Sequence, residues 1–138
     1  MNQVQNTSTG AVGYIWQFQN QSDTLINTTF WPAAFGNFDI ELMATSDRSC
    51  KDTMVKTITV LPSAMADFTT NKVNGCEDLQ VDFNNSSLHS YRYIWYFGNG
   101  VSSVNRDTSY LYSSHGTYMA SLVAINDNGC PNDTLTTE

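Results

Sequence analysis

The sequence predicts an all-β fold made of two β-sandwiches in tandem, and three observations support that prediction. Apolar and polar residues alternate with a period of two along most segments, as they do in half-buried strands. Asn, Ser and Thr supply 44 of the 138 residues, a composition that favours strands and turns over helices. The sequence also repeats itself at a spacing of about 80 residues.

The first half contains two clearly alternating segments. Residues 14–18 place three aromatic side chains on one face of a strand, and residues 38–42 alternate apolar side chains with Asp39 and Glu41. Residues 57–60 predict a further strand. We expect the core of this half to contain Trp16, Phe18 and Phe38.

The second half shows the same kind of pattern. Alternation predicts strands over residues 79–83, 93–97 and 118–124, and turn-forming residues follow at 98–100 and 126–129. We expect its core to contain Trp95, Phe97 and Tyr118. Several short strands separated by turns are typical of a sandwich.

Five ordered blocks of the first half recur in the second half. Residues 14–20 recur as residues 93–99, 79 residues later, and Cys50 falls on Cys130, 80 residues later. The sequence therefore predicts two related domains, over residues 1–62 and 63–138. They are joined near residues 61–63, where Pro62 favours a stiff joint.

The two copies begin and end at different points of the repeat. Residues 65–70 have no counterpart in the first copy, and residues 57–60 have none in the second. We therefore expect the first copy to lack its first strand and the second copy to lack its last strand. A sandwich without such a strand exposes unpaired backbone groups, so we expect reduced stability or a strand borrowed from another chain.

Charge and hydropathy exclude several kinds of partner. The net charge is −7, with six Lys and Arg residues and no basic cluster, so nucleic acid and anionic membranes are poor partners. No apolar run approaches the ~20 residues that span a bilayer, so direct membrane insertion is not expected.

One segment of the second half has a distinctive aromatic and glycine pattern: Trp95-Tyr96-Phe97-Gly98-Asn99-Gly100, followed later by Gly116-Thr117-Tyr118. In these features it resembles the polycystic kidney disease (PKD) repeat, whose hallmark is Trp-Asp-Phe-Gly-Asp-Gly. Residues 16–21 and 36–38 match the same elements more loosely. The resemblance implies immunoglobulin-like sandwiches of the PKD type, in tandem and extracellular.

The chain departs from that family's pattern at several positions. Tyr96 and Gln17 stand where the family has Asp, and the His expected before Tyr110 or Tyr112 is missing. The added Gly75-Cys76 and Gly129-Cys130 pairs look like the tandem repeats of large surface proteins of Bacteroidota. Those proteins include gliding-motility adhesins exported by the type IX system.

Three cysteines allow two interpretations. Cys76 lies between the first two predicted strands of the second copy and Cys130 follows its long strand, so a sandwich could bring both to one end. We predict a Cys76–Cys130 disulfide and an unpaired Cys50; three free buried thiols are the alternative. The sequence shows no Cys-x-x-Cys pair, and His89 and His115 are isolated, so no transition-metal site is expected.

The sequence offers little for cofactors or catalysis. Four carboxylates could group near the predicted disulfide and bind calcium, but no Asp-x-Asp-x-Asp loop is present, and turn capping is the favoured role. These residues are Glu77, Asp78, Asp127 and Asp133. Ser114-His115 is a neighbouring pair without an oriented base, so we expect no cofactor and no enzymatic activity.

We therefore expect a non-catalytic extracellular repeat that acts as a stalk or adhesive module of a large bacterial cell-surface protein, such as a gliding-motility adhesin. Its partners would be neighbouring repeats and, through weak multivalent contact, surface glycans or proteins. The alternative is an accessory module of a secreted hydrolase that binds glycan or protein, for which Tyr110 and Tyr112 are candidate surface aromatics.

Overall fold

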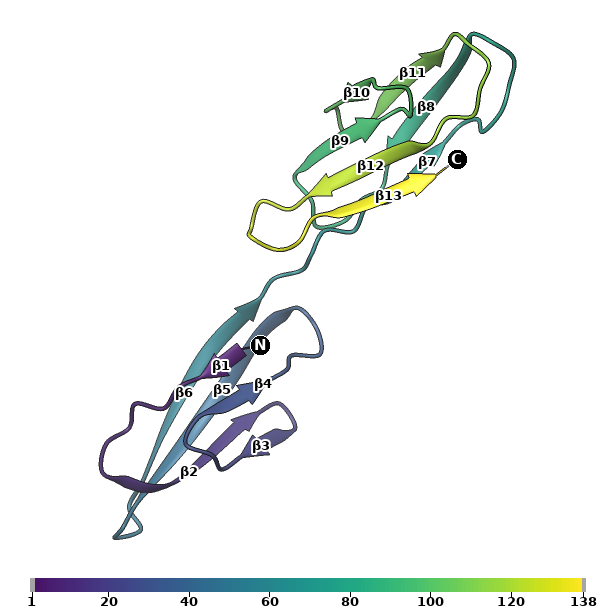
Figure 1. The fold of residues 1–138 in the computed structure, drawn as a ribbon. Helices are drawn as coiled ribbons and strands as arrows, with labels where there is room; N and C mark the ends of the chain where they lie inside the picture. The colour runs from purple at the N-terminus through teal and green to yellow at the C-terminus, as the bar shows by residue number, and fades with distance from the viewer. Residues whose placement is uncertain (1, 138) are drawn as a thin grey trace. The chain divides into compact units, whose positions relative to one another are not determined.

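The computed structural model describes residues 2–137, and its strands divide between two compact units (Figure 1). Unit 1 is Met1–Leu61 and unit 2 is Pro62–Glu138. All regular structure in the described residues is β, which confirms the predicted all-β class. No helix long and apolar enough to cross a membrane occurs in this part of the chain.

Unit 1 contains a four-stranded antiparallel sheet in the order β3-β2-β5-β6 and a two-stranded sheet of β1 and β4. A long hairpin of β5 and β6 dominates the larger sheet, because its strands pair from Gly36 opposite Val60 to Thr45 opposite Lys51. The strands are β1 (Asn2–Val4), β2 (Ala11–Phe18), β3 (Gln21–Asp23), β4 (Thr28–Phe30), β5 (Gly36–Ser46) and β6 (Lys51–Val60).

Unit 2 repeats the four-stranded order, as β10-β9-β12-β13, and sets it against a three-stranded sheet in the order β11-β8-β7. The added strand β7 pairs antiparallel with β8, from Phe68 opposite Asn85 to Thr70 opposite Phe83. The strands are β7 (Phe68–Thr70), β8 (Leu79–Asn85), β9 (Arg92–Tyr96), β10 (Ser102–Ser103), β11 (Thr108–Tyr112), β12 (Ala120–Ile125) and β13 (Asp133–Thr137).

Register and side-chain hydrogen bonds also recur between the units. Trp16 lies opposite Leu42 as Trp95 lies opposite Leu122. The indole of Trp16 donates to the Leu25 carbonyl at 3.1 Å, and the indole of Trp95 donates to the Asn105 carbonyl at 3.0 Å. A buried indole N–H needs a hydrogen-bond acceptor, and in both units a backbone carbonyl provides it.

Each unit has its own apolar core between its two sheets. In unit 1 the buried side chains are Trp16, Phe18, Phe30, Ile40 and Leu42, and Phe38 packs against them while only partly buried. In unit 2 the buried side chains are Phe68, Val81, Phe83, Trp95, Phe97, Tyr112, Ala120 and Leu122, and Tyr118 packs against them in the same partial way. The aromatic side chains of the alternating strands thus point inward.

The last strand of the second copy is present in part, as a counterpart of the first half of β6. Strand β13 pairs with β12 from Ala124 opposite Asp133 to Ala120 opposite Thr137. It occupies the place of β6 in unit 1, where Ala44 lies opposite Asp52. Strand β6 is twice as long as β13, and its most strand-like residues lie in the half that β13 does not match.

Candidate functional site

The aromatic and glycine segment of unit 2 forms the end of β9 and the turn that follows it. Trp95 is fully buried and Phe97 is 2% exposed, whereas Tyr96 between them points outward and is 47% exposed. Successive side chains of a strand point to opposite faces, so Trp95 and Phe97 point into the core and Tyr96 points to the solvent. The motif builds the core and leaves its middle side chain at the surface.

Gly98 is required by the backbone at this turn. Its φ is +80°, and a Cβ there would lie 2.7 Å from the backbone nitrogen of Met119. Only glycine combines that conformation with so close an approach of the backbone that leads into β12. The turn closes through a hydrogen bond from the Phe97 N–H to the Val101 carbonyl at 3.1 Å.

Tyr110 and Tyr112 support this turn and do not form the surface platform considered for glycan binding. Tyr112 is 7% exposed, and its hydroxyl donates to the Phe97 carbonyl at 3.1 Å. The ring of Tyr110 stacks on that of Phe97, with 4.4 Å between centroids. Burial beside Tyr110 and Tyr118 raises the pKa of the Tyr112 phenol, because the phenolate loses its hydration there. Both tyrosines are therefore structural residues.

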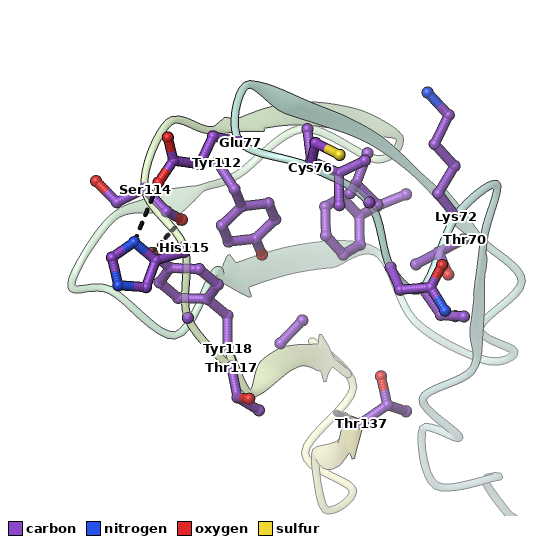
Figure 2. Close-up of a pocket in the computed structure, with 18 of the residues that line it drawn as sticks. Thr70, Lys72, Cys76, Glu77, Tyr112, Ser114, His115, Thr117, Tyr118 and Thr137 are labelled. Carbon is purple, nitrogen blue, oxygen red and sulfur yellow. Dashed lines mark hydrogen bonds and ion pairs between the residues drawn. The ribbon is translucent and has the colours of Figure 1, made fainter.

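A pocket of about 800 Å³ opens in unit 2 near the loop that connects β7 to β8 (Figure 2). Its floor is aromatic, because Tyr112 and Tyr118 pack with 4.5 Å between ring centroids. Figure 2 shows His115 and Glu77 on one side of the pocket and Lys72 on the other. The pocket thus combines an apolar floor with a polar rim, the usual composition of a small-molecule site.

The polar groups on the rim do not form a nucleophile with an oriented base. His115 Nδ1 lies 3.1 Å from a carboxylate oxygen of Glu77, and the two side chains are 93% and 61% exposed. The Ser114 carbonyl accepts from the Tyr118 hydroxyl at 3.1 Å, and no hydrogen bond joins the Ser114 hydroxyl to His115 in residues 2–137. Solvent screens such an exposed pair, so it offers weak electrostatic activation.

The structure contradicts the predicted Cys76–Cys130 disulfide. Cys76 lies in the β7–β8 loop and lines the pocket together with Thr137, at the end of β13. Cys130 lies in the β12–β13 loop, before β13 begins at Asp133. The two loops stand at opposite ends of unit 2 (Figure 1). A disulfide requires Cα atoms within about 7 Å, so the length of β13 prevents it.

The four carboxylates considered for calcium are separated in the same way. Glu77 and Asp78 belong to the β7–β8 loop, while Asp127 and Asp133 lie at the other end of unit 2. Asp127 pairs with Arg92, whose guanidinium lowers the pKa of that carboxyl through a hydrogen bond. Asp133 accepts from the Ala66 N–H at 2.8 Å. Among the described residues no three His, Cys, Asp or Glu side chains form a metal-binding group.

Sequence reasoning missed the contacts made by residues far apart in the chain. The Arg92–Asp127 and His115–Glu77 pairs each join residues more than thirty positions apart. The exposed aromatics Trp31 and Tyr91, at 61% and 70%, were missed as well. Both aromatics lie outside the predicted alternating segments, and this position was the available signal of their exposure. No local sequence pattern marks the two ion pairs.

The comparison with known families agrees with this geometry. The model of the PKD domain matches residues 59–138, which include every strand of unit 2 and more than half of the chain. A comparison with curated proteins found no match. PKD domains are generally non-catalytic and typically extracellular, and suggest a structural or adhesive module. The chain therefore belongs to the PKD domain family.

Proposed function

We propose that this chain is a non-catalytic stalk or adhesive segment of a large bacterial cell-surface protein, with unit 1 as a second PKD-type repeat. The recurrence of strand order, register and indole hydrogen bonds in the two units is the observation that supports the repeat. A gliding-motility adhesin is the kind of parent protein we favour, because of the Gly75-Cys76 and Gly129-Cys130 pairs. Neighbouring repeats would be its first partners.

Stretching single molecules of the whole chain tests this proposal. A stalk of two separately folded modules gives two unfolding events per molecule. Their contour-length gains should be on the order of 200–280 Å, since an extended chain spans ~3.3–3.6 Å per residue. Trp95→Ala should remove or weaken the event of unit 2 and leave that of unit 1, because each unit has its own core. A single cooperative event would contradict the modular proposal.

A glycan-binding accessory module is the second candidate, and the exposed aromatics favour it. Trp31 is 61% exposed in the loop that connects β4 to β5, and rings of this kind stack on sugars when they lie flat on a surface. Binding on a glycan array that is lost in Trp31→Ala and kept in Tyr91→Ala would support this function. Equal binding, or none, in all three proteins would argue for the stalk.

A further inference from the structure

Strand β6 gives unit 1 a long free edge. It lies at the end of the order β3-β2-β5-β6 and has ten residues, Lys51–Val60. The other strands that lie at a sheet edge in residues 2–137 have two to five residues each. An edge strand presents backbone N–H and C=O groups to any further strand, and a short edge limits such pairing. The length of β6 sets no such limit.

The backbone groups on this edge belong to the odd-numbered residues of β6. The Ser46 N–H donates to the Cys50 carbonyl at 2.8 Å, and residues of an antiparallel pair bond to the partner strand and face away from it in turn. In the register of β5 and β6, the even-numbered residues of β6 therefore bond to β5. The Thr53 N–H agrees with this direction, because it donates to the neighbouring Asp52 carboxylate at 3.0 Å.

Unit 2 shows that the segment before the shared strands does not cover this edge. Its residues 64–70 pair with β8, in the other sheet, and leave β13 at the end of its own sheet. The Ala64 N–H donates to the Pro131 carbonyl, which lies before β13 begins. The Ala66 N–H donates to one oxygen of the Asp133 carboxylate and leaves the other oxygen accessible. Because β13 occupies the place of β6, the free edge is a property of the fold.

Strand β6 is complementary in charge to a second copy of itself. In an antiparallel pair centred on Met54, Asp52 of each copy lies opposite Lys56 of the other, on the same face of the sheet. Val55, which is 57% exposed, lies opposite Thr53, and strands favour such β-branched side chains. Among the described residues, Lys56 forms no ion pair within its own chain. The second copy thus supplies the carboxylate that Lys56 lacks.

The two charges also select this register against the neighbouring ones. Centring the pair on Asp52 or on Lys56 sets like charges directly opposite each other, which destabilises a strand pair. Centring it one residue to either side of Met54 sets Lys56 opposite Cys50 or Met54. The ammonium then loses water without gaining a carboxylate. Among these five registers, the one centred on Met54 alone pairs each lysine with an aspartate.

The corresponding edge of unit 2 lacks this charge pattern. Strand β13 contains one charged residue, Asp133, and no cation. Pro131 follows Cys130 at the place where Lys51 follows Cys50. Proline has no N–H to donate to a further strand, so it protects the start of that edge. The self-complementary edge therefore belongs to unit 1 and is not a general feature of the repeat.

We propose that the edge of β6 is a self-association surface, on which a second copy of this chain adds its own β6 antiparallel, centred on Met54. The four-stranded sheets of the two copies then form one sheet of eight strands. The Thr53 N–H exchanges the Asp52 carboxylate for the Val55 carbonyl of the second copy, and Asp52 turns to Lys56 of that copy. Two copies are thereby held side by side. The inference rests on unit 1 alone and does not depend on the proposed stalk role.

Sedimentation velocity of the whole 138-residue chain over a range of concentrations tests the proposal. We expect a reversible equilibrium between monomer and dimer that weakens as salt is added, because salt screens exposed ion pairs. Hydrogen exchange at high and low protein concentration should show added amide protection at the odd-numbered residues of 51–57. The edges β11 and β13 of unit 2 should show none.

Charge exchange at two positions is the sharpest test. Asp52→Lys and Lys56→Asp should each weaken self-association at least about tenfold, because each variant sets like charges opposite each other at two places. An equimolar mixture of the two variants should form a heterodimer with the affinity of the unchanged chain, because every lysine then lies opposite an aspartate. The matched control is Lys72→Asp, an exposed residue of the β7–β8 loop, which should leave self-association unchanged.

A backbone variant tests the strand pairing itself. Val55→Pro removes an outward N–H and no bond to β5, a position where edge strands tolerate proline. It should abolish the dimer and keep the far-UV circular dichroism spectrum of the folded chain.

Several results would overturn the proposal. A chain that stays monomeric up to about 1 mM would leave the edge to a strand of another protein. A dimer that charge exchange does not weaken, or a mixture of the two variants that stays monomeric, would exclude the pairing of Asp52 with Lys56. Added protection at β11 or β13 in place of β6 would locate the contact on unit 2.

Discussion

The two units divide their stabilising structure differently. In the part of unit 1 that the structure describes, the hairpin β5–β6 pairs at ten positions, but the second sheet has two strands and the core has five buried side chains. Unit 2 pairs β12 with β13 at five positions, but its second sheet has three strands and its core has eight buried side chains. Unit 1 therefore has the longer ladder and unit 2 the larger core.

This difference shows that backbone pairing and core packing can be separated within one fold. Residues 51–57 of β6 are exposed on both faces, so the hydrogen bonds in that part of the hairpin bury little apolar surface. Each main-chain hydrogen bond replaces one with water and adds roughly 0.5–1.5 kcal/mol, whereas full burial of a side chain such as Phe adds roughly 1.5–3 kcal/mol. We therefore expect unit 2 to be the more stable unit, and four predictions test this comparison.

The largest expected effect comes from removing the central tryptophan of each unit. Trp95→Ala should reduce the free energy of unfolding of unit 2 by about 3–5 kcal/mol, because Trp95 is fully buried between Phe68 and Phe83. Trp16→Ala should cost unit 1 about 1 kcal/mol less, because Trp16 lacks a partner ring corresponding to Phe68. Urea unfolding followed by far-UV circular dichroism measures both. Equal losses would contradict the comparison.

The next effect concerns the turn after the central strand. Gly98→Ala should destabilise unit 2 by about 2–3 kcal/mol, because its Cβ would meet the Met119 backbone at a positive φ. Unit 1 has Gln19 at the corresponding position, also with a positive φ of 50°. Gln19→Gly should therefore stabilise unit 1 by about 0.5–1 kcal/mol. Thermal melts of both variants, with hydrogen exchange to assign the unit, check these opposite signs.

A smaller effect is expected at the tyrosine that supports this turn. Tyr112→Phe should cost unit 2 about 1–2 kcal/mol, because the buried Phe97 carbonyl loses its donor. Unit 1 has Pro32 in the corresponding place and makes no such bond. The control is Tyr110→Phe, whose hydroxyl accepts from Asn99 at the surface and whose loss should be within about 0.5 kcal/mol. Chemical denaturation measures the free energy of unfolding of both variants. Equal losses in the two variants would contradict the role assigned to the Tyr112 hydroxyl.

The smallest effect is a dependence on acid pH at two carboxylates, one half-buried and one exposed. Arg92 lowers the pKa of Asp127 in unit 2, and the Thr28 hydroxyl lowers the pKa of Asp23 in unit 1. A carboxyl with a lowered folded-state pKa stabilises above its unfolded pKa, and this contribution is lost as the pH falls through the folded-state value. NMR titration should show the pKa of Asp127 rising in Arg92→Gln and that of Asp23 rising in Thr28→Val. An unchanged pKa in either variant would rule out that pair as the cause.

Much of the fold could be predicted because its signals are local. The alternation around Trp16 and Trp95 places both indoles inside, since side chains of a strand point to opposite faces in turn. The Trp-x-Phe-Gly pattern indicated the family of residues 59–138 for the same reason, because strand, core and turn follow one another directly. By contrast, the alternative glycan-binding function needs Tyr110 and Tyr112 at the surface, and the structure places them in contact with Phe97. Their burial depends on the distant Phe97, which no local pattern reports.

The sequence by itself determined which segments are strands and which of their faces point inward. These properties follow from a side-chain period of two and from turn residues, both of which act over a few neighbours. Only the tertiary structure decided which loops meet. Strand direction places Cys76 and Cys130 at opposite ends of unit 2, and strand β13 separates them. In the described residues the tertiary structure also gives unit 1 a second sheet of two strands and unit 2 one of three, because the number of strands in a sheet depends on pairing between distant segments.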